Sequence, residues 1–109
     1  MLHVAIGIDI GGTTSRAALV DQQGNIVDLA RRPTPTAFEE LIEWIQEMYR
    51  ALSASRPAPV PLGLALPGVV DREKGVLVRS VNLAWLEEQP LVESLERELE
   101  VRPHLTTDA

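Results

Sequence analysis

Apolar and polar residues alternate with a period of two at the start of the chain, between residues 4 and 10. A period of two with β-branched residues is typical of a β-strand. Runs of the same kind follow at 15–20 (SRAALV) and 25–30 (NIVDLA). The intervening DQQGN is typical of a turn, in which Gly24 and Asn25 suit a positive φ. The pattern therefore predicts an antiparallel meander of three strands.

Two longer segments carry apolar residues at helical spacing instead. In residues 38–52 an apolar side chain recurs every three or four positions, and Thr36 with Glu39 has the spacing of a capping box. Residues 89–100 place leucine and valine on one side and acids on the other. We expect two amphipathic helices, with Trp44 off the main apolar side of the first and partly exposed.

The remaining segments complete a mixed sheet. Residues 60–68 (VPLGLALPG) barely alternate, which predicts a strand buried on both faces and parallel to the first. In residues 69–85 short apolar pairs are separated by polar residues, which predicts a surface β-excursion or loop. Residues 101–109 predict a fifth strand. The expected order is βββαβαβ. The fold class is α/β, with a mixed five-stranded sheet whose helices cover one face and part of the other.

Composition excludes several classes of function. The 109 residues fit one domain, and the absence of cysteine excludes disulfides and thiolate chemistry. The net charge of −6 disfavours nucleic acid as a partner, because an acidic surface repels phosphate backbones. No apolar run approaches the roughly 20 residues that cross a bilayer, and no basic segment precedes the first apolar run. We therefore expect a cytoplasmic protein without a membrane partner.

The candidate chemistry lies in residues 6–21, IGIDIGGTTSRAALVD. The lysine of a P-loop is absent, and these glycines join two strands, whereas a dinucleotide fingerprint leads into a helix. Glycines still let main-chain N–H groups converge on an anion, and neighbouring threonines add hydroxyl donors. An adjacent carboxylate, Asp9, is compatible with phosphate if Mg²⁺ and its waters lie between them. The alternative is a plain hairpin in which the glycines serve the turn and Asp9 caps it.

This segment closely resembles the first phosphate motif of the ROK family, which comprises repressors and sugar kinases. That family belongs to the actin-like ATPase superfamily, whose lobes have a ribonuclease H-like fold. Three further segments are similar to family segments in the same order: RRPTPT at 31–36, GLALPGVVDREKGVLVRSVNLAW at 63–85 and PLVESLERELEVRPHLTTDA at 90–109. Together they cover essentially the whole chain.

The resemblance implies that residues 1–109 form the N-terminal lobe of an ATP-dependent, glucokinase-like hexose kinase. It implies a catalytic base at Asp108, which takes the proton of the attacking sugar hydroxyl. The implied ligands are ATP, Mg²⁺ near Asp9 through water, and a hexose. The ATP phosphates are assigned to Gly11, Gly12, Thr13 and Thr14, and the sugar to Pro67, Gly68, Asn82 and Thr107.

Two positions depart from the family pattern. Thr14 stands where a lysine or another long side chain is common. Thr107 stands where the family commonly has an asparagine that helps to hold the sugar hydroxyls. A threonine hydroxyl donates one hydrogen bond and lacks the two-sided reach of an amide, so the identity of the sugar stays open.

Family members are much longer than this chain, so the resemblance also implies that the second wall of the cleft is missing. We expect the 109-residue chain to lack kinase activity and to self-associate through uncovered apolar surface. Three alternatives remain. One is a sugar-sensing repressor, whose helix-turn-helix would precede the hairpin; if Met1 is the native start, a strand that starts near His3 leaves no room for it. The second is a non-catalytic sugar-binding module of the same fold. The third is a different kinase or ATPase of the same superfamily, such as an acetylglucosamine kinase of the BadF type.

Overall fold

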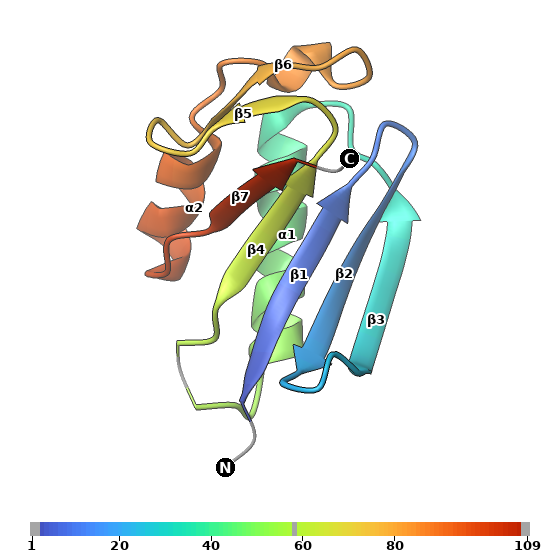
Figure 1. Cartoon of the computed structure of the whole chain (residues 1–109), viewed down its shortest axis with the longest axis vertical. Helices are drawn as coiled ribbons and strands as arrows, with labels where there is room; N and C mark the ends of the chain where they lie inside the picture. The colour runs from blue at the N-terminus through green and yellow to red at the C-terminus, as the bar shows by residue number, and fades with distance from the viewer. Residues whose placement is uncertain (1–2, 58, 108–109) are drawn as a thin grey trace.

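The computed structural model describes residues 3–57 and 59–107 (Figure 1). Its strands and helices follow one another as predicted, and the excursion predicted between the fourth strand and the second helix contains a short hairpin, β5 and β6. The elements are β1 (Val4–Ile10), β2 (Thr14–Asp21), β3 (Ile26–Pro33), α1 (Phe38–Ser53), β4 (Leu62–Leu66), β5 (Val69–Asp71), β6 (Val76–Arg79), the 3₁₀ helix η1 (Ala84–Leu86), α2 (Leu91–Leu99) and β7 (His104–Thr107).

The main sheet has five strands in the order β3-β2-β1-β4-β7, and it is mixed, as predicted. Strands β1, β2 and β3 form the antiparallel meander, while β4 and β7 run parallel to β1. Gly24 takes a φ of +86° in the turn between β2 and β3. The parallel strands therefore end together at one edge of the sheet, which is where open α/β sheets bind ligands.

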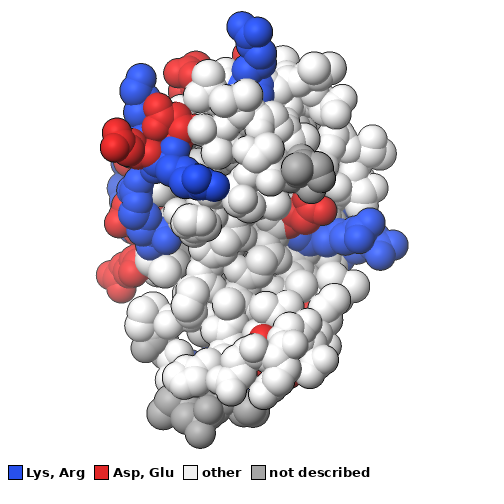
Figure 2. Space-filling model, in the orientation of Figure 1, with Lys and Arg blue, Asp and Glu red and all other residues white. Residues whose placement is uncertain are grey.

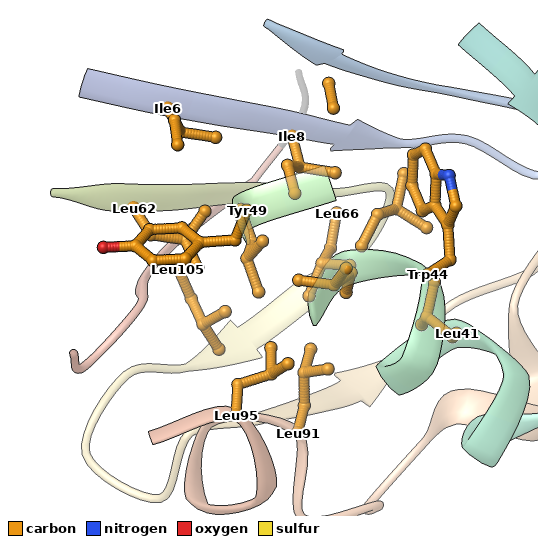
Figure 3. Close-up of a cluster of buried hydrophobic side chains, with 14 of the residues drawn as sticks. Ile6, Ile8, Leu41, Trp44, Tyr49, Leu62, Leu66, Leu91, Leu95 and Leu105 are labelled. Atoms are coloured by element: carbon orange, nitrogen blue, oxygen red, sulfur yellow. The ribbon is translucent and has the colours of Figure 1, made fainter. Parts of the chain in front are cut away.

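Helices α1 and α2 both lie on one face of the sheet, and they contact each other. Figure 3 shows side chains of both helices, among them Leu41 and Leu95, directed at strand residues such as Ile8 and Leu66. All four of these side chains are at most 1% exposed. The prediction that the helices would also cover part of the other face is wrong, because both β-α-β crossovers step across the sheet in the same direction.

The opposite face is open and largely uncharged in Figure 2. It carries a hollow of about 440 Å³ with a floor of small residues that includes Gly7, Ala18, Gly63 and Ala65. The prediction that β4 is buried on both faces is therefore wrong. Leu62, Leu64 and Leu66 are buried under the helices, whereas Gly63 and Ala65 between them are only partly covered.

Helix α1 differs from the prediction at two residues. Its N-cap is Ala37, without a side-chain hydrogen bond, so Thr36 and Glu39 form no capping box. The first helical bond runs from the Leu41 N–H to the Ala37 carbonyl, which places Thr36 one residue too early to cap. Trp44 is only 4% exposed, because the meander extends over that flank of the helix and the Arg32 guanidinium lies 5.9 Å from the ring centroid.

Residues 69–85 form the predicted excursion as a β5–β6 hairpin followed by η1. Gly68 begins the hairpin with a φ of +143°, and a Cβ there would lie 2.1 Å from the Arg79 carbonyl oxygen. Gly75 in the tip packs against Val92 of α2. The excursion is thus fastened to the end of β4 at one side and to α2 at the other.

In the part of the chain that the structure describes, each helix is too short or too polar to span a bilayer.

Candidate active site

Asp9 lies near the carboxyl end of β1 and faces the open side of the sheet. It is partly buried, and its Oδ1 atom is shielded from solvent. In the sheet register Asp9 is opposite Arg16 on β2 and Ala65 on β4, and Ala65 is in turn opposite Thr106 on β7. A carboxylate therefore stands on the open face beside the ends of the parallel strands, with one oxygen held in a dry environment and small neighbours on one side.

The glycine-threonine segment forms the tight connection from β1 to β2. The Gly11 N–H donates to the Thr14 carbonyl at 3.2 Å, and a Cβ on Gly11 would lie 2.7 Å from that same oxygen. Gly12, Thr13 and Thr14 are exposed at the tip. Among the hydrogen bonds of the described residues, none uses the N–H of Gly12 or Thr13. Two main-chain donors at the tip are thus available to an anion, which fits the phosphate groups of a nucleotide.

The structure brings Asn82, predicted to bind sugar, next to this hairpin. A Cβ built on Gly12 would lie 2.7 Å from the Asn82 Cβ, so the glycine permits a close contact with that side chain. The Asn82 loop is itself held in place, because the Ser80 N–H donates to Glu87 Oε2 at 2.8 Å and the Leu83 N–H donates to Ser80 Oγ at 3.2 Å. Residues that the sequence assigned to two different ligands therefore share one surface.

Pro67 and Gly68 follow the end of β4, and Thr107 ends β7 opposite Leu66. Gly68 and Arg79 bring the start of the β5–β6 hairpin to this same edge. Asp108, the predicted catalytic base, lies outside the described residues. The strand register and the Gly12–Asn82 contact together bring Asp9, Gly12, Asn82 and the ends of β4 and β7 to one edge of the sheet.

Two positioning contacts were missed by the sequence analysis. The Thr34 hydroxyl and N–H bond to the main chain of the hairpin at Gly11 and Thr13. The Arg72 Nε donates to the Leu105 carbonyl at 2.8 Å, which fixes the free edge of β7 just before Thr107. Both contacts join residues more than 20 positions apart, so no local pattern could have found them; for Thr34, the only signal was the resemblance of RRPTPT to a family segment.

Metal binding by protein ligands alone is not supported among the described residues, where no group of three or more His, Cys, Asp or Glu side chains comes together. A single carboxylate such as Asp9 suits Mg²⁺ that keeps most of its waters and also binds phosphate oxygens. His3, just before β1, and His104, the first residue of β7, are both exposed.

Comparison with known proteins identifies the family of the chain. The model of the ROK family matches residues 5–109 of the chain. This chain belongs to the ROK family. The match also confirms the resemblance inferred from the phosphate hairpin and the three segments after it.

The chain is similar to several sugar kinases of this family. It is 33% identical over 106 residues to a glucokinase of Thermotoga maritima, covering 95% of this chain and 33% of that protein. It superposes with a TM-score of 0.84 on a ROK family glucokinase from Streptomyces griseus solved with glucose and AMPPNP, at 26% identity, covering 97% of this chain and 33% of that one. The chain superposes with a TM-score of 0.81 on an inorganic polyphosphate/ATP-glucomannokinase from Arthrobacter sp. strain KM. The two are 31% identical, and the match covers 98% of this chain and 45% of that one.

The chain spans about a third of the length of the glucokinases that it matches. The fold is the α/β lobe with a mixed five-stranded sheet that the sequence predicted, and its homologues are ROK sugar kinases. One of those homologues holds an ATP analogue and glucose in its structure.

Proposed function

We propose that this chain is the N-terminal lobe of an ATP-dependent hexose kinase and supplies the phosphate hairpin and one wall of the sugar site. The proposal rests above all on the contact between Gly12 and Asn82, which joins an anion-binding turn to a polar side chain suited to sugar hydroxyls. Family membership and the similarity to glucokinases support it. Glucose is the proposed hexose, in a cytoplasmic protein.

Each proposed residue has one physical task. The Gly12 and Thr13 N–H groups donate to phosphate oxygens, and the Thr13 and Thr14 hydroxyls add further donors. Asp9 would hold bound Mg²⁺ through one of the waters of the metal. Bound ATP with Mg²⁺ supplies the phosphoryl group and offsets its negative charge.

The sugar would lie against the ends of β4 and β7. Pro67 and Gly68 form part of the wall, Asn82 and Thr107 hydrogen-bond hydroxyl groups, and Asp108 accepts the proton of the hydroxyl that attacks the γ-phosphoryl group. A general base of this kind contributes about 10² to 10⁴ in rate. Because this chain offers one wall only, water is not excluded and the reacting atoms are not held in line, so we expect no turnover by these 109 residues.

Nuclear magnetic resonance titration of the ¹⁵N-labelled chain tests the proposal. Mg·AMPPNP is expected to shift the amide signals of residues 9–14, and glucose those near Asn82 and Thr107. Asp9→Asn should remove the Mg²⁺ dependence of nucleotide binding while preserving the spectrum of the free protein. Scattered shifts, or equal nucleotide binding by Asp9→Asn with and without Mg²⁺, would contradict the proposed role of the hairpin.

A non-catalytic sugar-binding module of the same fold is the second candidate. Thr107, in place of the family's asparagine, changes one hydrogen-bonding group of the proposed sugar site, so it bears on which sugar binds and not on whether a nucleotide binds. This candidate predicts shifts with glucose and none with Mg·AMPPNP. Detection of ATP-dependent phosphorylation of glucose by the purified chain would overturn both the second candidate and the expected inactivity of the single lobe.

A further inference from the structure

We propose that Thr34 is a positioning residue that aims the Gly12 amide at the nucleotide phosphate; this inference rests on the proposed function. Thr34 directly follows β3, at the point where the chain leaves the sheet toward α1. Its Oγ1 atom lies 2.7 Å from the Gly11 carbonyl oxygen and 2.6 Å from Ser15 Oγ. Its N–H donates to the Thr13 carbonyl at 2.9 Å. One residue thus bonds to the hairpin at three points.

The direction of these hydrogen bonds follows from counting protons. A carbonyl oxygen only accepts, so the single hydroxyl proton of Thr34 must be donated to Gly11. Thr34 Oγ1 then accepts, and the proton between the two hydroxyls must come from Ser15. The two hydrogen bonds therefore run in one direction, from the Ser15 hydroxyl to Thr34 and from the Thr34 hydroxyl to the Gly11 carbonyl.

Because these hydroxyl groups are buried, their hydrogen bonds favour one conformation of the hairpin. Ser15 is 0% exposed and Thr34 is 9% exposed, so water has little access to either hydroxyl. A buried hydroxyl that loses its partner carries the full cost of desolvation. Any movement that takes the Gly11 carbonyl away from Thr34 is therefore opposed by two buried polar groups.

The Gly11 carbonyl and the Gly12 N–H belong to the same peptide unit. In a planar trans peptide these two groups point in opposite directions. When Thr34 holds the carbonyl inward, it also turns the Gly12 N–H outward. Gly12 is exposed, and in the described part of the chain its N–H makes no hydrogen bond. Thr34 thus orients a phosphate donor that it does not touch.

The test compares Thr34→Val, which removes the hydroxyl and keeps a β-branched shape, with Thr34→Ser, which keeps the hydroxyl. The probe is tripolyphosphate with Mg²⁺, and binding is followed at the Gly12 amide signal. We expect Thr34→Val to weaken binding about tenfold, as for the loss of one hydrogen bond that orients a donor. Thr34→Ser is expected to stay within about twofold of the natural protein, because the same bond can form.

Tyr49→Phe is the matched control for a loss of stability. The Tyr49 hydroxyl is buried and bonds to the Val60 carbonyl at 2.6 Å and the Val60 N–H at 3.1 Å, between α1 and the segment leading into β4. Its removal should lower the unfolding temperature and leave tripolyphosphate affinity unchanged. Hydrogen exchange at the Gly11 amide should accelerate in Thr34→Val and stay unchanged in Tyr49→Phe.

The possible outcomes separate the two proposals. If the natural chain does not bind tripolyphosphate, the proposed function fails, while the exchange data still test whether Thr34 holds the hairpin. If the natural chain binds and Thr34→Val binds equally well with unchanged exchange, the positioning role fails. Should Thr34→Val not fold, Thr34→Ala removes the same hydroxyl with a smaller side chain, and unchanged affinity and exchange in that variant would overturn the inference.

Discussion

At the scale of single residues, Gly12 is the position where the proposed phosphate hairpin and the Asn82 loop restrict each other. A methyl group at Gly12 would lie 2.7 Å from the Asn82 Cβ and 3.2 Å from its Cγ. Rotation about χ1 does not move the Asn82 Cβ, so Gly12→Ala has to shift the backbone of the hairpin tip or of the Asn82 loop, and it should lower the free energy of unfolding by about 1 to 3 kcal/mol. The displaced Asn82 amide loses its place at the proposed sugar site, and glucose affinity should fall about tenfold in an NMR titration.

Gly7→Ala is the control for this prediction. A Cβ on Gly7 would meet nothing within 4 Å. It should leave both the Asn82 signals and the glucose response as they are. Unchanged Asn82 signals in Gly12→Ala would show that the contact does not constrain the loop.

A single carboxylate also accounts for the turn between β2 and β3. Asp21 accepts from the Asn25 N–H at 2.9 Å and the Gln23 N–H at 3.0 Å. These bonds, that to Asn25 foremost, hold the pKa of Asp21 below its ordinary value of 3.8. A lowered pKa in the folded state stabilises the fold above the unfolded value and ceases to do so as the pH falls through the folded value.

We therefore expect Asp21→Ala to reduce the free energy of unfolding at neutral pH, by an amount that shrinks once the pH falls below 3.8. Denaturant unfolding at a series of pH values measures this difference. Gln23→Ala, an uncharged change in the same turn, should give a difference that does not vary with pH. A constant difference for Asp21→Ala would mean that its charge has no part in holding the turn.

At the scale of elements, the short β5–β6 hairpin depends on the backbone at Gly68. A Cβ there would come within 2.1 Å of the Arg79 carbonyl oxygen, and the φ of +143° is one that other residues rarely adopt. Since backbone atoms cannot move aside as a side chain can, Gly68→Ala should cost about 3 kcal/mol of stability. Chemical denaturation measures it, and signals of β5 and β6 should shift most.

Gly24→Ala separates the effect of a steric clash from the effect of a positive φ. Gly24 also has a positive φ, +86°, but its Cβ would meet nothing within 4 Å. We expect this substitution to cost only about 1 kcal/mol. Equal losses at the two glycines would indicate that the contact with Arg79 is not what fixes the hairpin.

The elements that the sequence predicted well are those encoded by neighbouring residues. The alternating run ending at Ile10, the turn at Gly24 and the acid-rich side of α2 each depend on residues a few positions apart. Trp44 was placed wrongly because its burial comes from the meander and from Arg32, which no helical pattern contains. Thr34 was missed for the same reason, since its partner Gly11 lies 23 positions away.

The site shows the same division between local and distant information. Asp9 and the glycine hairpin were predicted from one short segment, and in the structure they lie at the edge where open α/β sheets generally bind ligands. The contact between Gly12 and Asn82 depends on the path of the whole β5–β6 excursion, so it became visible only in the structure. The resemblance to the family identified these residues as candidates, and the fold shows that they lie close together.

At the scale of the whole molecule, the uncovered face of the sheet is the dominant feature. It combines a floor of small residues with Ile26 at 61% and Leu29 at 46% exposure, and Figure 2 shows little charge over its centre. Apolar surface of this kind favours association in water. We therefore predict that the 109-residue chain forms dimers or larger species through this face as its concentration rises.

Light scattering over a concentration series measures this association, and Leu29→Glu tests the face that carries it. Because Leu29 is half exposed and lies outside the buried core, its replacement should leave the fold intact while a charge in the contact shifts the chain toward monomer. Val81→Glu adds the same charge at a side chain that is 96% exposed, in the Asn82 loop away from the open face, and should leave association unchanged. A natural chain that stays monomeric at every concentration, or equal effects of the two substitutions, would show that the open face does not drive self-association.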